Sequence, residues 1–592
     1  MSRAAYPKHL TGRKLVGRSF LAALIFLALF TVGCRSDRRL PERLQADFSR
    51  NTSDVLRLGL YGDVGDLSPI GHHGEYDRSI CNLIHAAPLR IAADGSLEGD
   101  LFASWVSYPD ETGRLIVDGI WKQDLKWHDG TQFDPKALGF TFEAMRDPAN
   151  ASPYAALASE VVDVAPMDRG RRIRIVFPGL SRRYLELLTA GLLPPHLLEG
   201  KTIPEAKIER RVNASDTFAS VETGTSTQVL YTEYPVGLGE YRLADRKRGM
   251  FMELEAVHGA ASETARPIFR RILVRCHSQF ETLLNDFRQG RLDWMPVPSE
   301  IASKIEELQI PDARFCRYPN PSFLFWGFNM KKAPFDQMQV RTALATGIGR
   351  GAVRSKIPYD GTILTNMRIS ATATEAIVEN APETAQEAAD LAHLLDGTGL
   401  KDSNGDGKRD MNGKPFAMKI LVNEENLVRK LVAEEISSQL RRAGIDASVE
   451  AVSWSDLLGN RLVGDSWDSF LLSFQLPRSG NAVDLWHTPT ASITDSLNYC
   501  GISDPDLDSI LEQLDRWPEK ASPSTYLGSI SERLEAVRPG AFLFRPADVA
   551  AWHTYLSGPE NEANIIDMRP SAWQKKGGNG GAAVSAGSPD TR

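Results

Sequence analysis

The sequence predicts an α/β protein that is built from two or more lobes. The chain has 592 residues, which is more than a single hydrophobic core usually supports. Strand-like and helix-like patterns alternate between residues 54 and 576. A complete strand–helix–strand unit can be identified at residues 416–452, and such a unit is typical of a parallel sheet.

The unit at residues 416–452 has the clearest pattern. Its first strand places large apolar side chains at every second position: Phe416, Met418, Ile420 and Val422. Apolar residues then follow at helical spacing: Val428, Leu431, Val432, Ile436 and Leu440. Gly444 suits the left-handed position after a helix. Residues 445–451 alternate again, so the helix would connect two parallel strands by a right-handed crossover.

A second joint of strand and helix is predicted at residues 322–348. The run "SFLFWGFN" (322–329) is too aromatic for an exposed loop and indicates a strand, which we expect to leave one lobe and enter another. Asp336 is predicted to cap the next helix, with Gln339 three residues later as in a capping box. The apolar face of that helix would consist of Val340, Ala343, Leu344 and Ile348.

Residues 1–33 have the pattern of a secretory signal peptide. The positive residues are Arg3, Lys8, Arg13, Lys14 and Arg18. The apolar run at 20–32 is shorter than the roughly 20 residues of a membrane-spanning helix. Gly33 before Cys34 resembles a lipoprotein signal, in which the cysteine is lipidated. Thr31 stands where that motif has leucine, so a plain signal peptide and an uncleaved anchor stay as alternatives.

The two ends of the chain are predicted to lie outside the folded lobes. Residues 34–53 would comprise the lipidated cysteine and a polar tether. Residues 577–592 are rich in glycine, alanine and serine, and we expect them to be disordered. Between these ends, no segment has the length and hydrophobicity that a membrane span requires.

Four cysteines remain if Cys34 is lipidated, and their spacing matches no metal motif. They are Cys81, Cys276, Cys316 and Cys500. Four cysteines allow three sets of pairings, and a disulfide between Cys276 and Cys316 is one possibility in an oxidising compartment. The sequence leaves the disulfide state open.

Composition and motifs argue against several classes of function. The net charge is −8 without a basic stripe, so we expect no nucleic-acid partner. The sequence has no G-x-S-x-G, H-E-x-x-H or P-loop motif, so we expect neither enzymatic activity nor a cofactor. His128 and Asp129 in "WHDG" look like a catalytic dyad, but we interpret them as a turn that shapes the connection before Phe133.

Two other segments resemble metal sites only in part. His72 and His73 are adjacent and therefore lack the spacing of two ligands on one face. The segment 402–410 ("DSNGDGKRD") resembles part of a calcium loop, but Gly413 stands where calcium needs a bidentate glutamate. We interpret this segment as a turn rich in side-chain hydrogen bonds, and we predict no metal site.

The stretch "NMKKAPFDQMQVRTALATGIGR" (329–350) resembles bacterial extracellular solute-binding proteins of family 5, which serve oligopeptide and dipeptide ABC transporters. That family shows an asparagine, a turn with lysine and proline, and "PF-D--VR-AL" before a helix. Other segments resemble further blocks in the family's order: 125–145, 147–157, 235–243, 287–294, 399–410, 466–476 and 484–488. The resemblance covers about residues 55–575, and several blocks in order are stronger than any one alone.

The resemblance implies a periplasmic binding protein-like α/β fold with two lobes, hinge crossing strands and an extra subdomain in lobe I. The implied parts are lobe I at 54–98, 230–325 and 540–576, the extra subdomain at 99–229, and lobe II at 326–539. The implied protein is a monomeric, extracytoplasmic lipoprotein that binds peptides between closing lobes. It would deliver them to a membrane permease whose partner ATPase supplies the energy.

The resemblance also implies a set of ligand-contacting residues. His73, Gly74 and Glu75 match a loop that pairs with the ligand backbone. The aromatic matches are Tyr154, Phe325, Trp326, Trp454 and Phe474. Arg461 matches a cation that could receive a ligand carboxylate. For the aromatic residues the alternative is a place in the core, and for Arg461 it is an ordinary surface position.

One departure from the family pattern leaves the cargo open. Oligopeptide binders have an aspartate for the peptide's amino terminus where this chain has Pro477, followed by Arg478. Proline cannot pair with an ammonium. Either the ligand lacks a free amino group, or Glu75 takes that role. A non-peptide cargo (a sugar, an opine-like compound or a metal chelate) and a ligand sensor without transport therefore remain alternatives.

Overall fold

The structure is a computed structural model of the chain. It describes residues 40–71, 77–92, 96–211, 226–257, 267–320, 322–358, 361–363, 387–464, 466–475, 482–490, 496–516, 524–561 and 569–576. The predicted signal peptide, Cys34 and the predicted tail lie outside these residues. In the part of the chain that is described, no helix combines the length and hydrophobicity needed to cross a membrane.

The described residues divide into two compact units at the boundary between Asn51 and Thr52. In the first unit the structure describes one helix, α2 (Glu42–Ser49), which follows Pro41. Proline is well suited to this place because its fixed φ angle fits the start of a helix. The helix falls inside the stretch predicted as a tether, so that stretch is not wholly extended.

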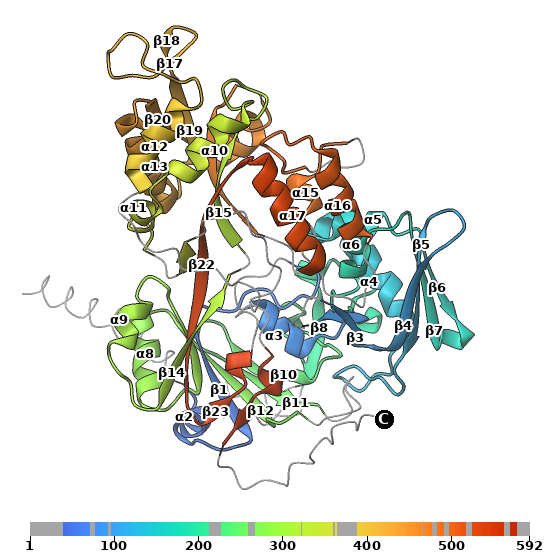
Figure 1. Ribbon diagram of the computed structural model, residues 1–592. Helices are drawn as coiled ribbons and strands as arrows, with labels where there is room; N and C mark the ends of the chain where they lie inside the picture. The colour runs from blue at the N-terminus through green and yellow to red at the C-terminus, as the bar shows by residue number, and fades with distance from the viewer. Residues whose placement is uncertain are drawn as a thin grey trace, which may run out of the picture. The chain divides into compact units, whose positions relative to one another are not determined.

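The second unit is organised around a mixed sheet of 12 strands (Figure 1). The strands of lobe I are β1 (Val55–Tyr61), β10 (Tyr241–Lys247), β11 (Phe251–Ala256), β12 (Arg271–His277), β13 (Trp294–Val297) and β14 (Ala313–Pro319). Those of lobe II are β15 (Ser322–Phe328), β16 (Gly361–Ile363), β19 (Ala417–Asn423), β20 (Asp446–Val452) and β21 (Ser469–Gln475). Strand β22 (Gly540–His553) belongs to both lobes.

Two extended segments connect the lobes. The last part of β22 pairs with β13 and β14, whereas its first part pairs with β15 and β16. Strands β14 and β15 are separated by only a short connection, so the chain passes from lobe I to lobe II there and returns along β22. The crossing strands expected for the fold are therefore confirmed.

Helices cover the sheet in both lobes. Those of lobe I are α3 (Asp77–Ile84), α8 (Phe280–Arg288) and α9 (Ala302–Glu306). Those of lobe II are α10 (Met338–Gly347), α11 (Arg350–Arg354), α12 (Glu387–Asp396), α13 (Leu427–Arg442), α14 (Trp454–Asp456), α15 (Val483–Trp486), α16 (Pro505–Asp515) and α17 (Ser524–Val537). Two hydrophobic cores lie on opposite faces of the lobe II sheet, one with α10–α13 and one with α15–α17.

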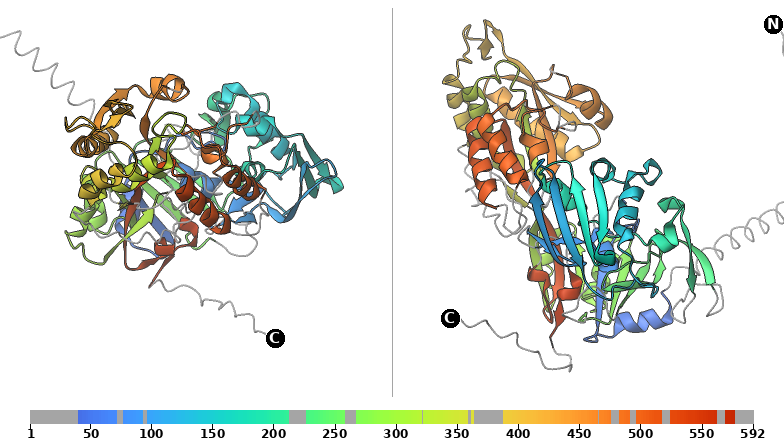
Figure 2. Two further views of the ribbon diagram at one scale, coloured as in Figure 1. Left: turned by 45° about the horizontal axis from the view of Figure 1, so that its top comes forward. Right: turned by 90° about the vertical axis from the view of Figure 1, so that its right-hand side faces the viewer.

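A separate antiparallel sheet forms an extra subdomain. Its strands, in the order β4–β5–β7–β6, are β4 (Phe102–Pro109), β5 (Leu115–Trp121), β6 (Asp163–Met167) and β7 (Arg172–Phe177). Its helices are α4 (Lys136–Arg146), α5 (Ala155–Ser159), α6 (Arg182–Leu187) and α7 (Pro195–Leu198). Figure 2 shows this sheet and its helices in blue to cyan. The subdomain has its own hydrophobic core. Every second residue of β7 (Ile173, Ile175 and Phe177) is buried in that core, as expected for a sheet that is covered on one face.

The remaining elements are short. Paired short strands are β2 (Leu89–Ile91) with β3 (Leu97–Gly99), β8 (Lys207–Arg211) with β9 (Ser226–Leu230), β17 (Asp410–Met411) with β18 (Lys414–Pro415), and β23 (Leu556–Ser557) with β24 (Gln574–Lys575). Short helical turns are η1 (Pro148–Asn150), η2 (Asp168–Gly170), η3 (Ile203–Glu205), η5 (Leu457–Arg461), η6 (Pro559–Asn561) and η7 (Pro570–Ala572).

The predicted strand–helix–strand unit is confirmed as β19–α13–β20. The two strands pair in parallel, and Asn426 caps the helix by accepting a hydrogen bond from the Arg429 N–H. Gly444 has a φ of +88°, as expected for the left-handed residue after a helix. Leu431 was expected on the apolar face but is 43% exposed, because it lies at the edge of that face.

The predicted strand at 322–329 and the following helix are confirmed as β15 and α10, but the predicted cap is wrong. Helix α10 begins at Met338, and Asp336 stands outside the cap position, which Gln337 occupies without a side-chain hydrogen bond. Arg341 explains the later start. Its guanidinium donates to the carbonyl oxygens of Phe335 and Asp336, which holds the preceding turn away from the helix.

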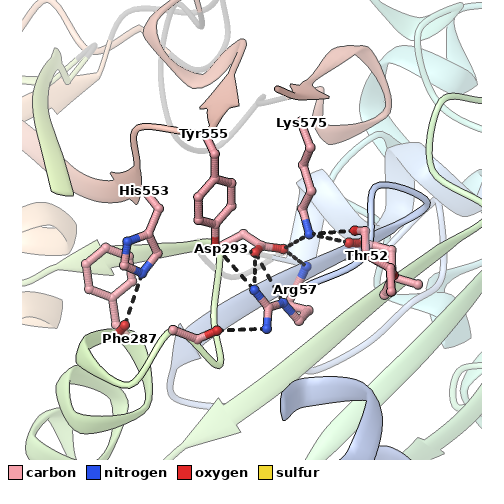
Figure 3. Close-up of polar contacts among 9 residues, drawn as sticks. Thr52, Arg57, Phe287, Asp293, His553, Tyr555 and Lys575 are labelled. Carbon is pink, nitrogen blue, oxygen red and sulfur yellow. Dashed lines mark hydrogen bonds and ion pairs between the residues drawn. The ribbon is translucent and has the colours of Figure 1, made fainter. Parts of the chain in front are cut away.

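A buried ionic cluster joins the end of the described chain to the first strand of lobe I (Figure 3). Asp293 accepts hydrogen bonds from Arg57 (Nη2–Oδ1 2.6 Å) and Tyr555 (Oη–Oδ1 2.8 Å), and Lys575 Nζ lies 2.8 Å from its Oδ2. Burial alone would raise the pKa of Asp293, but the charges of Lys575 and Arg57 outweigh burial and lower it. Lys575 also donates to the Val55 carbonyl, so β24 is fixed against β1.

The described residues include the four cysteines left open by the sequence and the predicted turn at 402–410. Cys81, Cys276, Cys316 and Cys500 are free thiols, so the pairing of Cys276 with Cys316 is absent here. The segment 402–410 is a turn, as predicted. The Asp402 carboxylate accepts N–H bonds from Gly405 (2.7 Å) and Gly407 (2.9 Å), which commits its oxygens to the backbone.

Candidate ligand-binding site

The carboxyl ends of β19 and β20 carry Trp454, the most exposed of those predicted site residues that the structure describes. In an open α/β sheet, ligands bind beyond the carboxyl ends of the parallel strands. Trp454 begins α14 there and is 44% exposed, which is high for a tryptophan in a folded lobe. Ser453 fixes the turn before it, because its hydroxyl caps α14 by accepting the Asp456 N–H (3.3 Å).

The side chains around Trp454 form a connected polar set. The Arg429 guanidinium carbon lies 5.7 Å from the centre of the Trp454 ring, within the range of a cation–π contact. Arg429 also donates to Asn423 Oδ1 (2.8 Å). Glu425 accepts the Trp454 N–H at Oε1 (3.0 Å) and the Asn423 amide at Oε2 (3.1 Å). These bonds, with that from Trp454 the largest cause, lower the pKa of Glu425.

Arg461 lies in the next turn, η5, but its charge is already paired. Its guanidinium donates to the Glu450 carboxylate on β20, and its Nη1 lies 3.9 Å from Asp456. Lys419 contacts the same Glu450 carboxylate at 3.0 Å. Hydrogen bonds from Lys419 and Arg461 lower the pKa of Glu450, so the carboxylate stays charged. A ligand carboxylate would therefore share Arg461 with a protein carboxylate.

The predicted aromatic residues of β15 and β21 are buried. Phe325 is 1% exposed and Phe474 is 9% exposed, and their ring centres lie 6.0 Å apart in one aromatic cluster with Trp486. Trp326 is fully buried in the other core of lobe II. Successive residues of a strand point to opposite faces, so Phe325 and Trp326 cannot line the same surface. Phe474 stays closest to solvent of the three.

Tyr154 belongs to the extra subdomain, directly before α5. It is half-buried against the core of that subdomain. The neighbouring Ser152 hydroxyl donates to the carbonyl of Ile70 (2.8 Å), so the loop with Tyr154 is fixed to the chain just ahead of residues 72–76. The predicted His73, Gly74 and Glu75 lie outside the described residues, as do Pro477 and Arg478.

Apart from the buried Phe325, Trp326 and Phe474, the structure groups the described site residues into two sets. Tyr154 lies in lobe I, and the exposed Trp454 with Arg461 lies on one segment of lobe II. Asn423, Glu425 and Arg429, which surround Trp454, were not among the residues predicted from the sequence. The sequence did contain a pattern that could have indicated them. Polar residues stand between the strand and the capped helix at 423–426, and such residues often lie at the ligand side of a parallel sheet.

Comparison with known proteins places the chain in a family. Residues 121–490 match the family described as "Bacterial extracellular solute-binding proteins, family 5 Middle". The oligopeptide-binding protein AppA of Bacillus subtilis is 22% identical over 579 residues, which cover 93% of this chain and 96% of AppA.

Solved structures resemble the fold. The unliganded open form of MppA, a periplasmic murein tripeptide-binding protein, is 16% identical with a TM-score of 0.69, and the match covers 88% of this chain and 97% of MppA. NikA from Brucella suis in complex with Fe(III)-EDTA is 16% identical with a TM-score of 0.64, covering 88% of this chain and 100% of NikA. These likenesses confirm the expected periplasmic binding protein-like fold.

Proposed function

Because the chain belongs to the bacterial extracellular solute-binding proteins of family 5, we propose that it is the peptide-binding component of an ABC importer. The observation that carries this proposal is the family match over residues 121–490, in a chain with two lobes joined by crossing strands. As a member of this family, the protein acts outside the cytoplasm and is a binding protein, not an enzyme. The similarity to AppA, an oligopeptide-binding protein, supports peptides as the cargo.

The proposed mechanism is closure of the lobes around the ligand. The crossing strands β14–β15 and β22 would act as the hinge, since few elements connect the lobes there. Ser181 at the start of α6 donates to Asp515 at the end of α16 (2.9 Å), and Arg183 lies 3.9 Å from Asp484. These contacts join the extra subdomain to lobe II and would break on opening. The permease would then recognise the closed form, and its ATPase would supply the energy.

We propose that the ligand contacts Tyr154, Trp454 and Phe474 together with the loop at 73–75. Trp454 and Tyr154 support this proposal by their partial exposure, and Phe474 by its place at the end of β21. Phe325 and Trp326 would support the site from within the two cores. Arg461 would receive a ligand carboxylate in exchange for part of its pairing with Glu450.

The organisation of the chain completes the proposal. Residues 1–33 would be a signal peptide, and Cys34 would be the lipidated residue that anchors a monomeric protein to the membrane. The lobes would follow the predicted boundaries, with 99–229 as the extra subdomain of lobe I. The position of β4–β9 supports that boundary, because these strands pair only with one another.

Native mass spectrometry of the full chain, purified from a secreting host without refolding, tests the cargo. We expect bound mass that resolves into a ladder of short peptides after denaturation. A single non-peptide mass would keep the fold and overturn the peptide assignment. A chelate is the specific alternative, since NikA carries Fe(III)-EDTA in a similar fold. A protein without bound mass would be titrated with free and N-acetylated peptides, and binding of neither would refute the proposal.

A further inference from the structure

We infer that Glu425 is a specificity-determining residue, which pairs with a cationic side chain of the bound peptide beside Trp454. This inference rests on the proposed peptide-binding function and deepens it. Glu425 is the second residue after β19 and lies with Trp454 at the carboxyl ends of the two parallel strands of lobe II. That edge is where an open α/β sheet presents groups to a ligand.

The carboxylate of Glu425 is held in place but stays open to solvent. Its Oε1 accepts the Trp454 N–H and its Oε2 accepts the Asn423 amide. The backbone N–H of Glu425 itself also interacts with the carboxylate. A carboxylate has about four acceptor sites, so capacity remains toward the exposed side. The Glu425 side chain is exposed. Its position is fixed by the Trp454 backbone N–H and by Asn423, a buried residue that is only 5% exposed. In the described structure the carboxylate is therefore preorganised, and its hydrogen bonds come from a backbone N–H and an amide rather than from a protein cation.

The neighbouring charges favour a cation rather than an anion at this point. Lys430 acts on Glu425 through its charge, and the Arg429 guanidinium donates to Asn423 Oδ1 and lies over the Trp454 ring. Arg429 is half-buried, whereas the Glu425 side chain is exposed. A ligand that approaches from solvent thus meets a negative charge in front of a positive one.

The exposed part of the Trp454 ring supplies the apolar half of the site. Lysine and arginine carry long apolar stems below a charged head, and such stems pack on aromatic surfaces. With its stem on Trp454 and its head on Glu425, a basic peptide side chain would satisfy both groups. A neutral aliphatic side chain of similar length would keep the first contact and lose the second.

Calorimetric titration of the full chain with two matched peptide pools tests this inference. Both pools consist of alanine-based pentapeptides, with one lysine or one norleucine at each position in turn. We expect Glu425→Gln to weaken binding of the lysine pool about twofold to fivefold, as expected for an exposed ion pair, and to leave binding of the norleucine pool unchanged. Glu424→Gln removes the adjacent exposed carboxylate, for which no side-chain partner is seen in the described structure, and serves as the matched control.

A charge reversal distinguishes recognition from a structural role. Glu425→Lys is expected to shift the preference from the lysine pool to a third pool that carries glutamate, which loss of folding could not produce. Equal weakening of lysine and norleucine peptides by Glu425→Gln would overturn the inference, and so would an equal effect of Glu424→Gln. If the unmodified protein bound none of the pools, the peptide-binding function itself would fail, and this inference with it.

Discussion

His128 connects two loops of lobe I through a neutral imidazole ring, and this arrangement predicts a specific dependence of stability on pH. Its Nδ1 accepts the Gly237 N–H (3.3 Å), so the ring proton is on Nε2, which donates to the Gly239 carbonyl (3.0 Å). Burial is the largest cause that lowers the pKa of His128 from 6.5 to about 4. Protonation would place a second N–H against the Gly237 N–H and break that bond.

The sign of the effect follows from the two pKa values. Between pH 6.5 and about 4 the unfolded chain binds a proton at His128 and the folded protein does not. The stabilisation is therefore complete above pH 6.5 and is lost progressively as the pH falls toward 4. One pKa unit corresponds to about 1.4 kcal/mol, and partial exposure of the ring reduces the full difference, so we expect about 2 kcal/mol.

Urea unfolding of the natural protein and of His128→Gln between pH 8 and pH 4 measures this contribution. The glutamine amide can donate to the Gly239 carbonyl but does not titrate. The free-energy advantage of the natural protein should therefore decrease by about 2 kcal/mol from pH 7 to pH 4. Parallel curves for the two proteins would refute the reasoning, as would an NMR titration that places the native His128 pKa near 6.5.

Three further predictions concern the folded lobes and their contact. Asp293→Ala leaves two buried cations without their carboxylate, and we expect a loss of about 3 to 5 kcal/mol in urea unfolding at pH 7. Asp504→Ala removes the side-chain cap of α16 and the pair with Arg533 (2.7 Å), at a cost of about 1 to 2 kcal/mol. The Arg533 hydrogen bond lowers the Asp504 pKa, so this difference should be present above pH 4 and vanish as the pH falls further. Asp515→Ala removes the bond from Ser181 between α6 and α16, and we expect small-angle X-ray scattering to show a larger radius of gyration for the ligand-free protein.

Glu532→Ala is a common control for these three variants. It removes an exposed carboxylate of α17 for which no hydrogen bond or ion pair is seen in the described structure. A cost below about 1 kcal/mol for Asp293→Ala would contradict the account of the buried cluster. If the effect of Asp504→Ala did not depend on pH, the prediction for the α16 cap would be wrong. If Asp515→Ala gave the same scattering curve as the control, the prediction for the contact between α6 and α16 would be wrong.

Much of the fold could be predicted because its signals are local. The parallel unit β19–α13–β20 follows from a period of two, a period of 3.6 and a glycine at the helix end. Strand β15 follows from its aromatic run. The start of α10 was not predictable in the same way. Arg341 decides it by donating to Phe335, and the same guanidinium is held by the carbonyl of Val537, almost two hundred residues away.

The candidate site was predictable in type but not in its contacts. Trp454 was selected by resemblance, and its exposure agrees with a contact surface. The alternation of a strand indicates that Phe325 and Trp326 face opposite ways. Only the packed layers show that both faces of the lobe II sheet are covered, and hence that both residues are buried.

The sequence by itself therefore determined the α/β class, the family and the order of the main elements, because periodicity, turn residues and motif order lie along the chain. The tertiary structure decided the partners of the polar side chains. Arg461 meets Glu450 of β20, and His128 meets Gly239 more than a hundred residues later. A hydrogen bond or an ion pair depends on distances of a few ångströms in space, and the order of residues does not contain those distances.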